Sequence, residues 1–131
     1  FPYTTLFRSP PALYSAAIFV TDIERAIAFY RDTLKLPLAK QGSFGAEFFA
    51  EGTRLGIHPA RHPNALEMVG RDTGLVLHVP GILDYCSDLM DAGVTFVSEP
   101  TKQSWGIMAL VADPDGNRIA LWEQREETPA P

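Results

Sequence analysis

The chain has 131 residues, of which 46% are hydrophobic and 21% are charged, and its formal net charge is −5 at pH 7. This length and composition predict one globular domain and exclude a disordered chain. The negative charge disfavours nucleic-acid binding, since phosphate contacts need clustered lysine and arginine, and slightly favours cationic or neutral ligands. No apolar run approaches the roughly 20 residues of a membrane span. The single cysteine, Cys86, excludes an intrachain disulfide framework, so a reducing cytoplasm is the simplest compartment.

The two ends of the chain differ from its middle. Residues 1–10 lack a starting Met and show no clean periodicity, and they end at Pro10-Pro11, through which a helix cannot continue. We expect them to be a leader or a non-native segment. Residues 126–131 predict a frayed polar tail.

The first half of the chain begins with a β-prone run and a helix. Residues 14–20 are mostly apolar and predict a strand covered on both faces. Thr21-Asp22-Ile23-Glu24 has the spacing of a capping box. The helix is expected to run to about Leu36, because Pro37 ends it. Two strands follow, at residues 44–50 and 53–59, divided by a turn at Glu51-Gly52.

The second half repeats this order. A strand at residues 75–79 precedes a helix whose end is marked by Ala92-Gly93, a typical left-handed cap. Asp113-Pro114-Asp115-Gly116-Asn117 is a strong turn signal, because proline presets φ and glycine accepts a positive φ. The remaining predictions are a short strand at 94–97, a loop at 99–104, and strands at 107–112 and 118–123.

The recurrence indicates a duplicated module. Val20-Thr21-Asp22-Ile23 and Val79-Pro80-Gly81-Ile82, which open the two helices, are 59 positions apart, and the closing strands are offset by 64. We therefore predict an α+β fold of two βαβββ modules that form a cupped mixed sheet. The expected layout is a single domain at 11–125, with module one at 11–60, a linker at 61–72 and module two at 73–124.

These features together resemble the vicinal oxygen chelate superfamily, which includes glyoxalases, epimerases, extradiol dioxygenases and bleomycin-resistance proteins. The resemblance rests on the turn at residues 113–117 leading into Ile119-Ala120-Leu121-Trp122-Glu123, on Ala28-Phe29-Tyr30, and on Trp105-Gly106. It covers residues 12–124, nearly the whole chain. It implies the fold strongly but leaves the function open, because one fold carries many chemistries.

The resemblance also implies where a metal would bind. In the metal-dependent members, ligands come from the first and last strands of each module, and the corresponding slots here hold Ser15, Gly56, Gly74 and Ala120. A divalent ion needs several imidazole or carboxylate donors, and these four residues supply none. The sequence therefore predicts no metal and no cofactor, and it favours a non-enzymatic role without deciding it.

Small residues at the four slots predict a cup with an empty centre. Strand alternation places Phe19, His58, His78 and Trp122 on the same inward face. Trp105 follows a loop, at a position typical of a lid. We expect these five residues to contact a ligand, although a rim hydrogen bond for His58, a capping or surface role for His78 and a core role for Trp122 stay open. Glu47 and Glu67 are expected in solvent, and Glu123 is out of phase with Ala120.

Two functions of different class follow. The first is a metal-independent small-molecule binding protein resembling bleomycin-resistance proteins, which sequester a drug between the chains of a homodimer. Its ligand would be cationic or aromatic. The second is a metal-dependent glyoxalase-like lyase, epimerase or dioxygenase that uses His58 and another donor.

Overall fold

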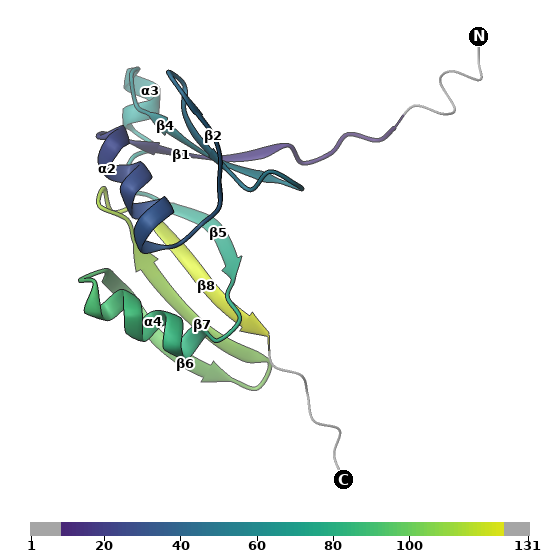
Figure 1. The fold of residues 1–131 in the computed structure, drawn as a ribbon, viewed down its shortest axis with the longest axis vertical. Coiled ribbons are helices and arrows are strands. Elements are labelled where there is room, and N and C mark those ends of the chain that lie inside the picture. Colours follow the sequence, from purple (N-terminus) through teal and green to yellow (C-terminus); the bar gives the residue numbers. More distant parts are fainter. Residues whose placement is uncertain (1–8, 125–131) are drawn as a thin grey trace.

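The computed structural model describes residues 9–124, whose strands form two four-stranded mixed sheets with the orders β1-β4-β3-β2 and β5-β8-β7-β6. In each sheet the first pair, β1 with β4 or β5 with β8, is parallel, and the other pairs are antiparallel. Figure 1 shows module one above module two, with α2 and α4 on the same side of the molecule. The α+β fold of two βαβββ modules is thus confirmed. The elements are β1 (Ser15–Val20), α2 (Ile23–Ala28), η1 (Phe29–Thr33), β2 (Leu38–Gly42), β3 (Gly45–Phe48), β4 (Arg54–Pro59), α3 (Pro63–Leu66), β5 (Asp72–His78), α4 (Ile82–Asp91), β6 (Thr95–Gln103), β7 (Gly106–Ala112) and β8 (Arg118–Gln124).

The first helix begins as predicted but is capped by a different residue. Asp22, not Thr21, is the N-cap, and its carboxylate accepts a hydrogen bond from Arg25 N at 3.1 Å. The predicted capping box is therefore wrong. After Ala28 the helix widens into the π-helical η1, in which Leu34 N donates to Phe29 O at 2.9 Å.

Three elements were not predicted, or were predicted too short. The edge strand β2 was missed. The edge strand β6 extends through residues 99–104, expected to be a loop, as far as Gln103. A single helical turn, α3, lies inside the predicted linker with Pro63 in its first position.

Each sheet packs one face against a helix. Burial alternates along the strands. In β1, Ile18 and Val20 are buried, whereas Ala17 and Phe19, which point to the other face, are only partly buried. The module-two core is built in the same way around α4, from which Ile82, Cys86 and Leu89 are buried. Within residues 9–124, neither α2 nor α4 covers the opposite face of its sheet.

The turn at residues 113–117 joins the two modules, and we call it, with its partners in module one, the module clasp. The Tyr30 hydroxyl donates to Asp113 Oδ2 at 2.7 Å in a buried contact. Thr21 Oγ1 donates to Asp115 Oδ1 at 2.6 Å, and Asn117 Nδ2 donates to Phe19 O at 3.1 Å. The relative position of the modules is therefore fixed by polar contacts as well as by packing.

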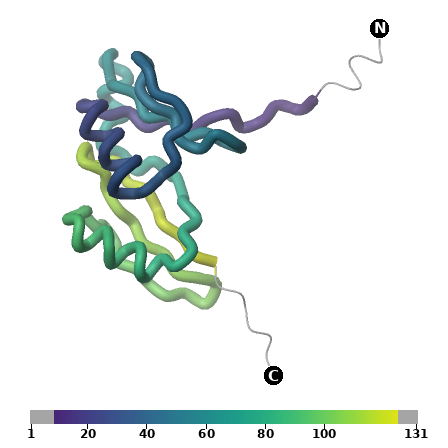
Figure 2. The backbone as a smooth tube through the Cα atoms, viewed as in Figure 1, coloured from purple at the N-terminus to yellow at the C-terminus, as the bar shows by residue number. Residues whose placement is uncertain are grey.

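The segment before β1 leaves the body of module one as an extended arm, which Figure 2 shows as the purple tube. Leu13 and Tyr14 in this arm are exposed, although Leu13 O and Tyr14 O accept hydrogen bonds from Thr53 and Arg54. Residues 1–8 and 125–131 lie outside the described residues, and with them most of the expected leader and the whole expected tail. Within residues 9–124, no helix is long and apolar enough to cross a membrane.

Candidate functional site

Each sheet has one face that neither α2 nor α4 covers in the part of the chain that the structure describes, and these two faces carry most of the residues that the sequence singled out. Side-chain alternation along β1, β4, β5 and β8 places these residues opposite the core. The module-one open face holds Ser15, Ala17, Phe19, Gly56 and His58, and the module-two open face holds Val76, His78, Ala120 and Trp122. Gly74 lies in the register shift between Asp72 and Val76 with a φ of 71°, so alternation does not place it on either face.

The four slots of the resemblance lie two by two. On β1 and β4 the Cα partner of Gly56 is Ala17, and on β5 and β8 the Cα partner of Ala120 is Val76. The strands β1 and β5 belong to different sheets and do not pair with each other within residues 9–124. One chain therefore offers two half-sites, and each has an unpaired strand edge beside it.

The slot residues do not fit a metal ion. Ser15 offers a hydroxyl, Ala120 a methyl group, and the two glycines offer no side chain. Over the described range 9–124, no group of three or more His, Cys, Asp or Glu side chains lies close enough to hold a metal. The donor set of the metal-dependent members has no counterpart here, so we derive no step through a metal.

The Gly56 slot is filled by a neighbouring side chain and is not an open space. The imidazole of His58 lies over Gly56, and a Cβ placed on residue 56 would be 2.5 Å from His58 Nε2. The ring is held by its other nitrogen, since Nδ1 lies 2.9 Å from Phe44 O at the tip of the β2–β3 hairpin. Phe19 and Phe44 flank the ring, with centroids 6.0 Å and 6.4 Å away. The module-one open face is therefore lined by three adjacent rings.

Tryptophan dominates the module-two open face. The Trp122 indole lies across Gly106, where a Cβ would be 2.6 Å from Trp122 Cη2. Trp105 is 52% exposed, and its ring centroid is 6.5 Å from that of Trp122. His78 is the register partner of Trp122 and is exposed, and so is Met108 on the other side of Trp122. Met108 and Val76 belong to this apolar patch, and sequence reasoning did not select them as contacts.

The five predicted residues thus fall into two groups. Phe19 lies beside His58, and Trp105 lies beside Trp122 with His78 next in register. No described contact joins the two groups within one chain. Phe44 also belongs to the first group, because its ring and its carbonyl oxygen contact His58. It lies at the tip of a hairpin formed with β2, a strand that the sequence did not predict.

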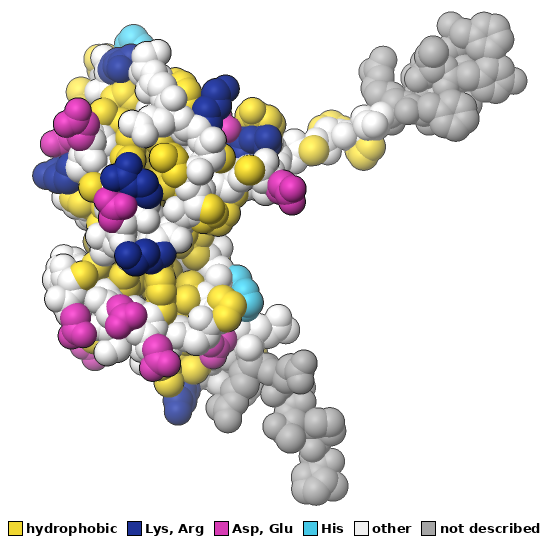
Figure 3. All heavy atoms as spheres, viewed as in Figure 1, with side chains coloured by type: hydrophobic (Ala, Val, Ile, Leu, Met, Phe, Trp, Pro, Cys, Tyr) yellow, Lys and Arg dark blue, Asp and Glu magenta, His cyan; other side chains and the backbone are white. Residues whose placement is uncertain are grey.

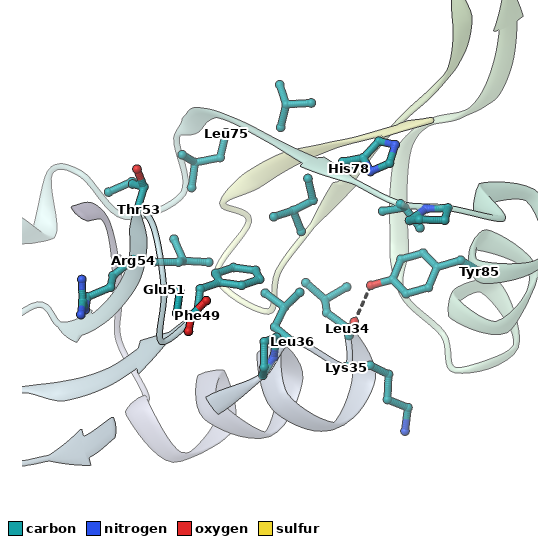
Figure 4. Close-up of a pocket in the computed structure, with 17 residues that line it drawn as sticks. Leu34, Lys35, Leu36, Phe49, Glu51, Thr53, Arg54, Leu75, His78 and Tyr85 are labelled. Atoms are coloured by element: carbon teal, nitrogen blue, oxygen red, sulfur yellow. Dashed lines mark hydrogen bonds between the residues drawn. The ribbon is translucent and has the colours of Figure 1, made fainter. Parts of the chain in front are cut away.

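A cavity of about 710 Å³ lies between the modules, and sequence reasoning missed it. Figure 4 shows Phe49 pointing into it from module one and Tyr85 reaching across to Leu34 from module two. The Tyr85 hydroxyl donates to Leu34 O at 2.5 Å, and burial raises the pKa of Tyr85 to about 12. The edge strands β1 and β5 both contribute to the wall, through Ala16 and through residues 75–78.

The other candidate groups have structural roles. Glu123 caps helix α4 from outside, since its Oε1 accepts hydrogen bonds from Gly81 N and, at 3.0 Å, from Ile82 N. Glu47 pairs with Arg54 at 3.2 Å, and it is not the free surface carboxylate expected. Cys86 is buried, and burial raises the pKa of its thiol, which disfavours the reactive thiolate.

Comparison with known proteins finds a matching protein family and a similar bacterial protein. The family model described as Glyoxalase/Bleomycin resistance protein/Dioxygenase superfamily matches residues 12–121. The uncharacterized protein YurT of Bacillus subtilis is 32% identical over 120 residues, covering 80% of this chain and 93% of that protein.

Two solved structures share the fold over most of their length. TnmS3, an antibiotic binding protein from a Streptomyces species, is 26% identical with a TM-score of 0.74, covering 90% of this chain and 99% of that chain. A member of the same superfamily from Sphaerobacter thermophilus is 25% identical with a TM-score of 0.75, covering 88% and 98%.

Proposed function

The chain belongs to the glyoxalase/bleomycin-resistance protein/dioxygenase superfamily, and from this premise we propose that it is a metal-independent binding protein that sequesters a small organic molecule without transforming it. The ligand class is a planar or extended aromatic compound such as an antibiotic. The similarity to TnmS3, described as an antibiotic binding protein, supports this ligand class.

The observation that carries the proposal is the uncovered pair of tryptophans. Trp105 lies in the turn between β6 and β7, and its ring centroid is 6.5 Å from that of Trp122 on the module-two open face. Trp105 is more than half exposed. Large exposed aromatic side chains cost free energy in water and typically mark a surface that binds something. Phe19, His58 and Phe44 give module one a comparable surface.

The proposed binding unit is a cytoplasmic homodimer. Both β1 and β5 have an unpaired edge within the described residues, and unpaired edges are generally covered in a stable protein. A twofold axis would let β1 of one chain approach β5 of a second chain. The same contact would occur a second time with the chains exchanged, so the β1 and β5 edges of both chains would be covered. The exposed Leu13 and Tyr14 of the arm would then find apolar surface on the partner. The one thiol, Cys86, is free and buried, as suits a reducing compartment.

In such a dimer each binding cleft would combine two half-sites. The module-one open face of one chain, with Phe19 and His58, would lie opposite the module-two open face of the other, with His78, Trp105 and Trp122. The ligand would be held by stacking on both sides and by the imidazoles at its edge. No bond of the ligand would change.

Tryptophan fluorescence tests the proposal directly. Titration of the purified protein with bleomycin and with planar aromatic compounds should quench Trp105 and Trp122 saturably. Trp122→Ala should weaken binding at least tenfold, which corresponds to about 1.4 kcal/mol, while circular dichroism stays unchanged. Trp105→Phe, which keeps an aromatic ring, should weaken it less.

Metal analysis and light scattering complete the test. The protein as purified should contain no stoichiometric divalent ion, and its mass in solution should be that of two chains. A tightly held stoichiometric ion would favour the metal-dependent lyase, epimerase or dioxygenase instead. Absence of saturable quenching by any of these compounds would remove the support for a binding function.

A further inference from the structure

His58 combines three features that set it apart from the other aromatic residues of the two open faces. Its Nδ1 lies 2.9 Å from Phe44 O, its Nε2 occupies the space above Gly56, and its ring is only partly buried. The carbonyl oxygen of Phe44 can only accept a hydrogen bond, so Nδ1 must carry the proton of that bond. In the neutral imidazole, Nε2 is then unprotonated and acts as an acceptor.

The lack of a side chain at Gly56 leaves room for this acceptor. A Cβ at position 56 would be nearer to Nε2, at 2.5 Å, than to the adjacent ring carbons Cδ2 and Cε1, both at 3.3 Å. Any side chain there would thus displace the ring or fill the space in front of Nε2. Gly56 is buried in the middle of β4 and does not have a positive φ, so the backbone does not require glycine at this position. The close contact with the His58 ring does require it.

The ring is also fixed in orientation. Phe19 and Phe44 flank it with tilted rings at 6.0 Å and 6.4 Å, and Phe44 lies at the hairpin tip that Arg61 holds through a 3.0 Å bond to Ser43 O. A ligand atom therefore meets an acceptor that needs little reordering, which lowers the entropic cost of forming the hydrogen bond.

The geometry points to His58 as the specificity-determining residue of the proposed cleft, which selects aromatic ligands that carry an N–H or O–H donor at their edge. This assignment rests on the proposed binding function. The ligand stacks on the neighbouring rings and donates to His58 Nε2 over Gly56. Aromatic compounds of the same shape that offer only acceptors are bound less tightly.

Two substitutions distinguish the roles of the two ring nitrogens of His58. Asparagine can still donate from its Nδ2 to Phe44 O but has no atom at the Nε2 position. Glutamine reaches the Nε2 position with its amide but loses the bond to Phe44 O. His58→Asn should therefore keep the fold and remove the acceptor at the Nε2 position. His58→Gln should keep part of the acceptor function there.

The binding test uses 2-naphthol, which has an O–H donor, and its methyl ether, which has none, in equilibrium dialysis. Wild-type protein should prefer 2-naphthol by roughly threefold to tenfold, the range of one net hydrogen bond. The preference should vanish in His58→Asn and persist in part in His58→Gln. Trp122→Ala should weaken both compounds alike and leave the preference unchanged.

The results distinguish this assignment from the proposed function. Equal affinity of wild-type protein for the two compounds, or a preference that survives in His58→Asn, overturns the role of His58 while leaving aromatic binding intact. Failure of both compounds to bind wild-type protein overturns the assignment, and the binding function falls with it only if bleomycin and the other planar aromatic compounds also fail to quench the tryptophans. Long-range ¹H–¹⁵N correlation spectra of the free protein give a second readout, because they report the tautomer of His58. A proton on Nε2 in place of Nδ1 overturns the assignment.

Discussion

At the scale of the residue, the hydroxyl of Tyr85 shows how burial shapes the response of this protein to pH. The hydroxyl donates to Leu34 O across the cavity between the modules, and burial raises the pKa of Tyr85 from its ordinary value of 10.0 to about 12. Below pH 10 the phenol is protonated in both folded and unfolded chains. Between about pH 10 and pH 12 only the folded chain keeps the proton, so a rise in pH favours unfolding.

We expect the free energy of unfolding to fall steadily from pH 10 to pH 12 and to fall less steeply in Tyr85→Phe. The variant should also be less stable at pH 7 by about 1 kcal/mol, because it lacks the hydrogen bond to Leu34 O. Urea unfolding at pH 7, 10 and 11 measures both effects. Tyr14, which is 65% exposed, provides the matched control, since Tyr14→Phe should change stability by less than about 0.5 kcal/mol. Identical slopes for wild type and Tyr85→Phe would contradict the assignment of this pH dependence to Tyr85.

The residues of the open faces could be predicted from sequence, but their contacts could not. Alternation along a strand is a local property, so Phe19, His58 and Trp122 could be placed on one side of their strands from the pattern alone. The absence of a side chain at Gly56 indicated a void. The structure fills it with the His58 ring, whose orientation depends on Phe44 O. That carbonyl comes from a hairpin formed with β2, an element that local pattern did not reveal.

At the scale of the element, the sequence signals that worked carry a strong local preference. The turn at residues 113–117 and the glycine cap Gly93, with φ of 82°, both match backbone geometry that few residues adopt. The elements missed are set by their neighbours. The edge strand β2 is almost wholly exposed and pairs with β3, and Pro100 does not prevent β6 because an edge strand has one unpaired side.

Helix α4 illustrates a cap supplied by another element. Its N-cap residue, Gly81, has no side chain, so Glu123 of β8 accepts the hydrogen bonds of Gly81 N and Ile82 N. A carboxylate at a helix N-terminus also interacts favourably with the helix dipole. No local pattern around Gly81 predicts this partner, because it lies 42 positions along the chain.

Glu123→Ala should therefore destabilise the protein by about 1 to 2 kcal/mol in urea unfolding. Glu123→Gln keeps an acceptor oxygen without the charge, and we expect it to lose about half as much. Glu99→Ala, at an exposed position of the edge strand β6, is the control and should be near neutral. A loss for Glu123→Ala no larger than that for Glu99→Ala would show that the cap contributes nothing.

At the scale of the whole molecule, the distribution of charge qualifies the expectation of a cationic ligand. Figure 3 shows acidic side chains gathered over module two, where α4 carries the exposed residues Asp84, Asp88 and Asp91. Helix α4 packs on the core face of its sheet, opposite the open face with Trp122. These acidic side chains therefore lie away from the proposed half-sites, and the charge distribution gives no support to a cationic ligand in the proposed cleft.

The duplication could be read from the sequence, but the way in which the modules hold together could not. Residues that look like local signals act between modules. Thr21, expected to cap its own helix, binds Asp115, and the turn at residues 113–117 does more than reverse the chain. Because partners in the module clasp are more than 80 positions apart, a local pattern carries no information about them.

Asn117 is the centre of the module clasp, and its loss should weaken the whole molecule. It is fully buried, its Oδ1 accepts from Gly70 N at 2.8 Å, and its Nδ2 donates to Phe19 O and to Asp113 Oδ2. Asn117→Ala removes these three hydrogen bonds, at a cost of about 3 kcal/mol, while Asp113 Oδ2 still accepts from the Tyr30 hydroxyl. Scanning calorimetry should show one cooperative transition for wild-type protein and, in the variant, a melting temperature lower by about 10 °C. Asn64→Ala, on the exposed face of α3, should leave the melting temperature within about 2 °C. Two separate transitions in the wild-type protein would mean that the modules fold independently, and the clasp would then not couple the half-site beside Phe19 to the half-site beside Trp122.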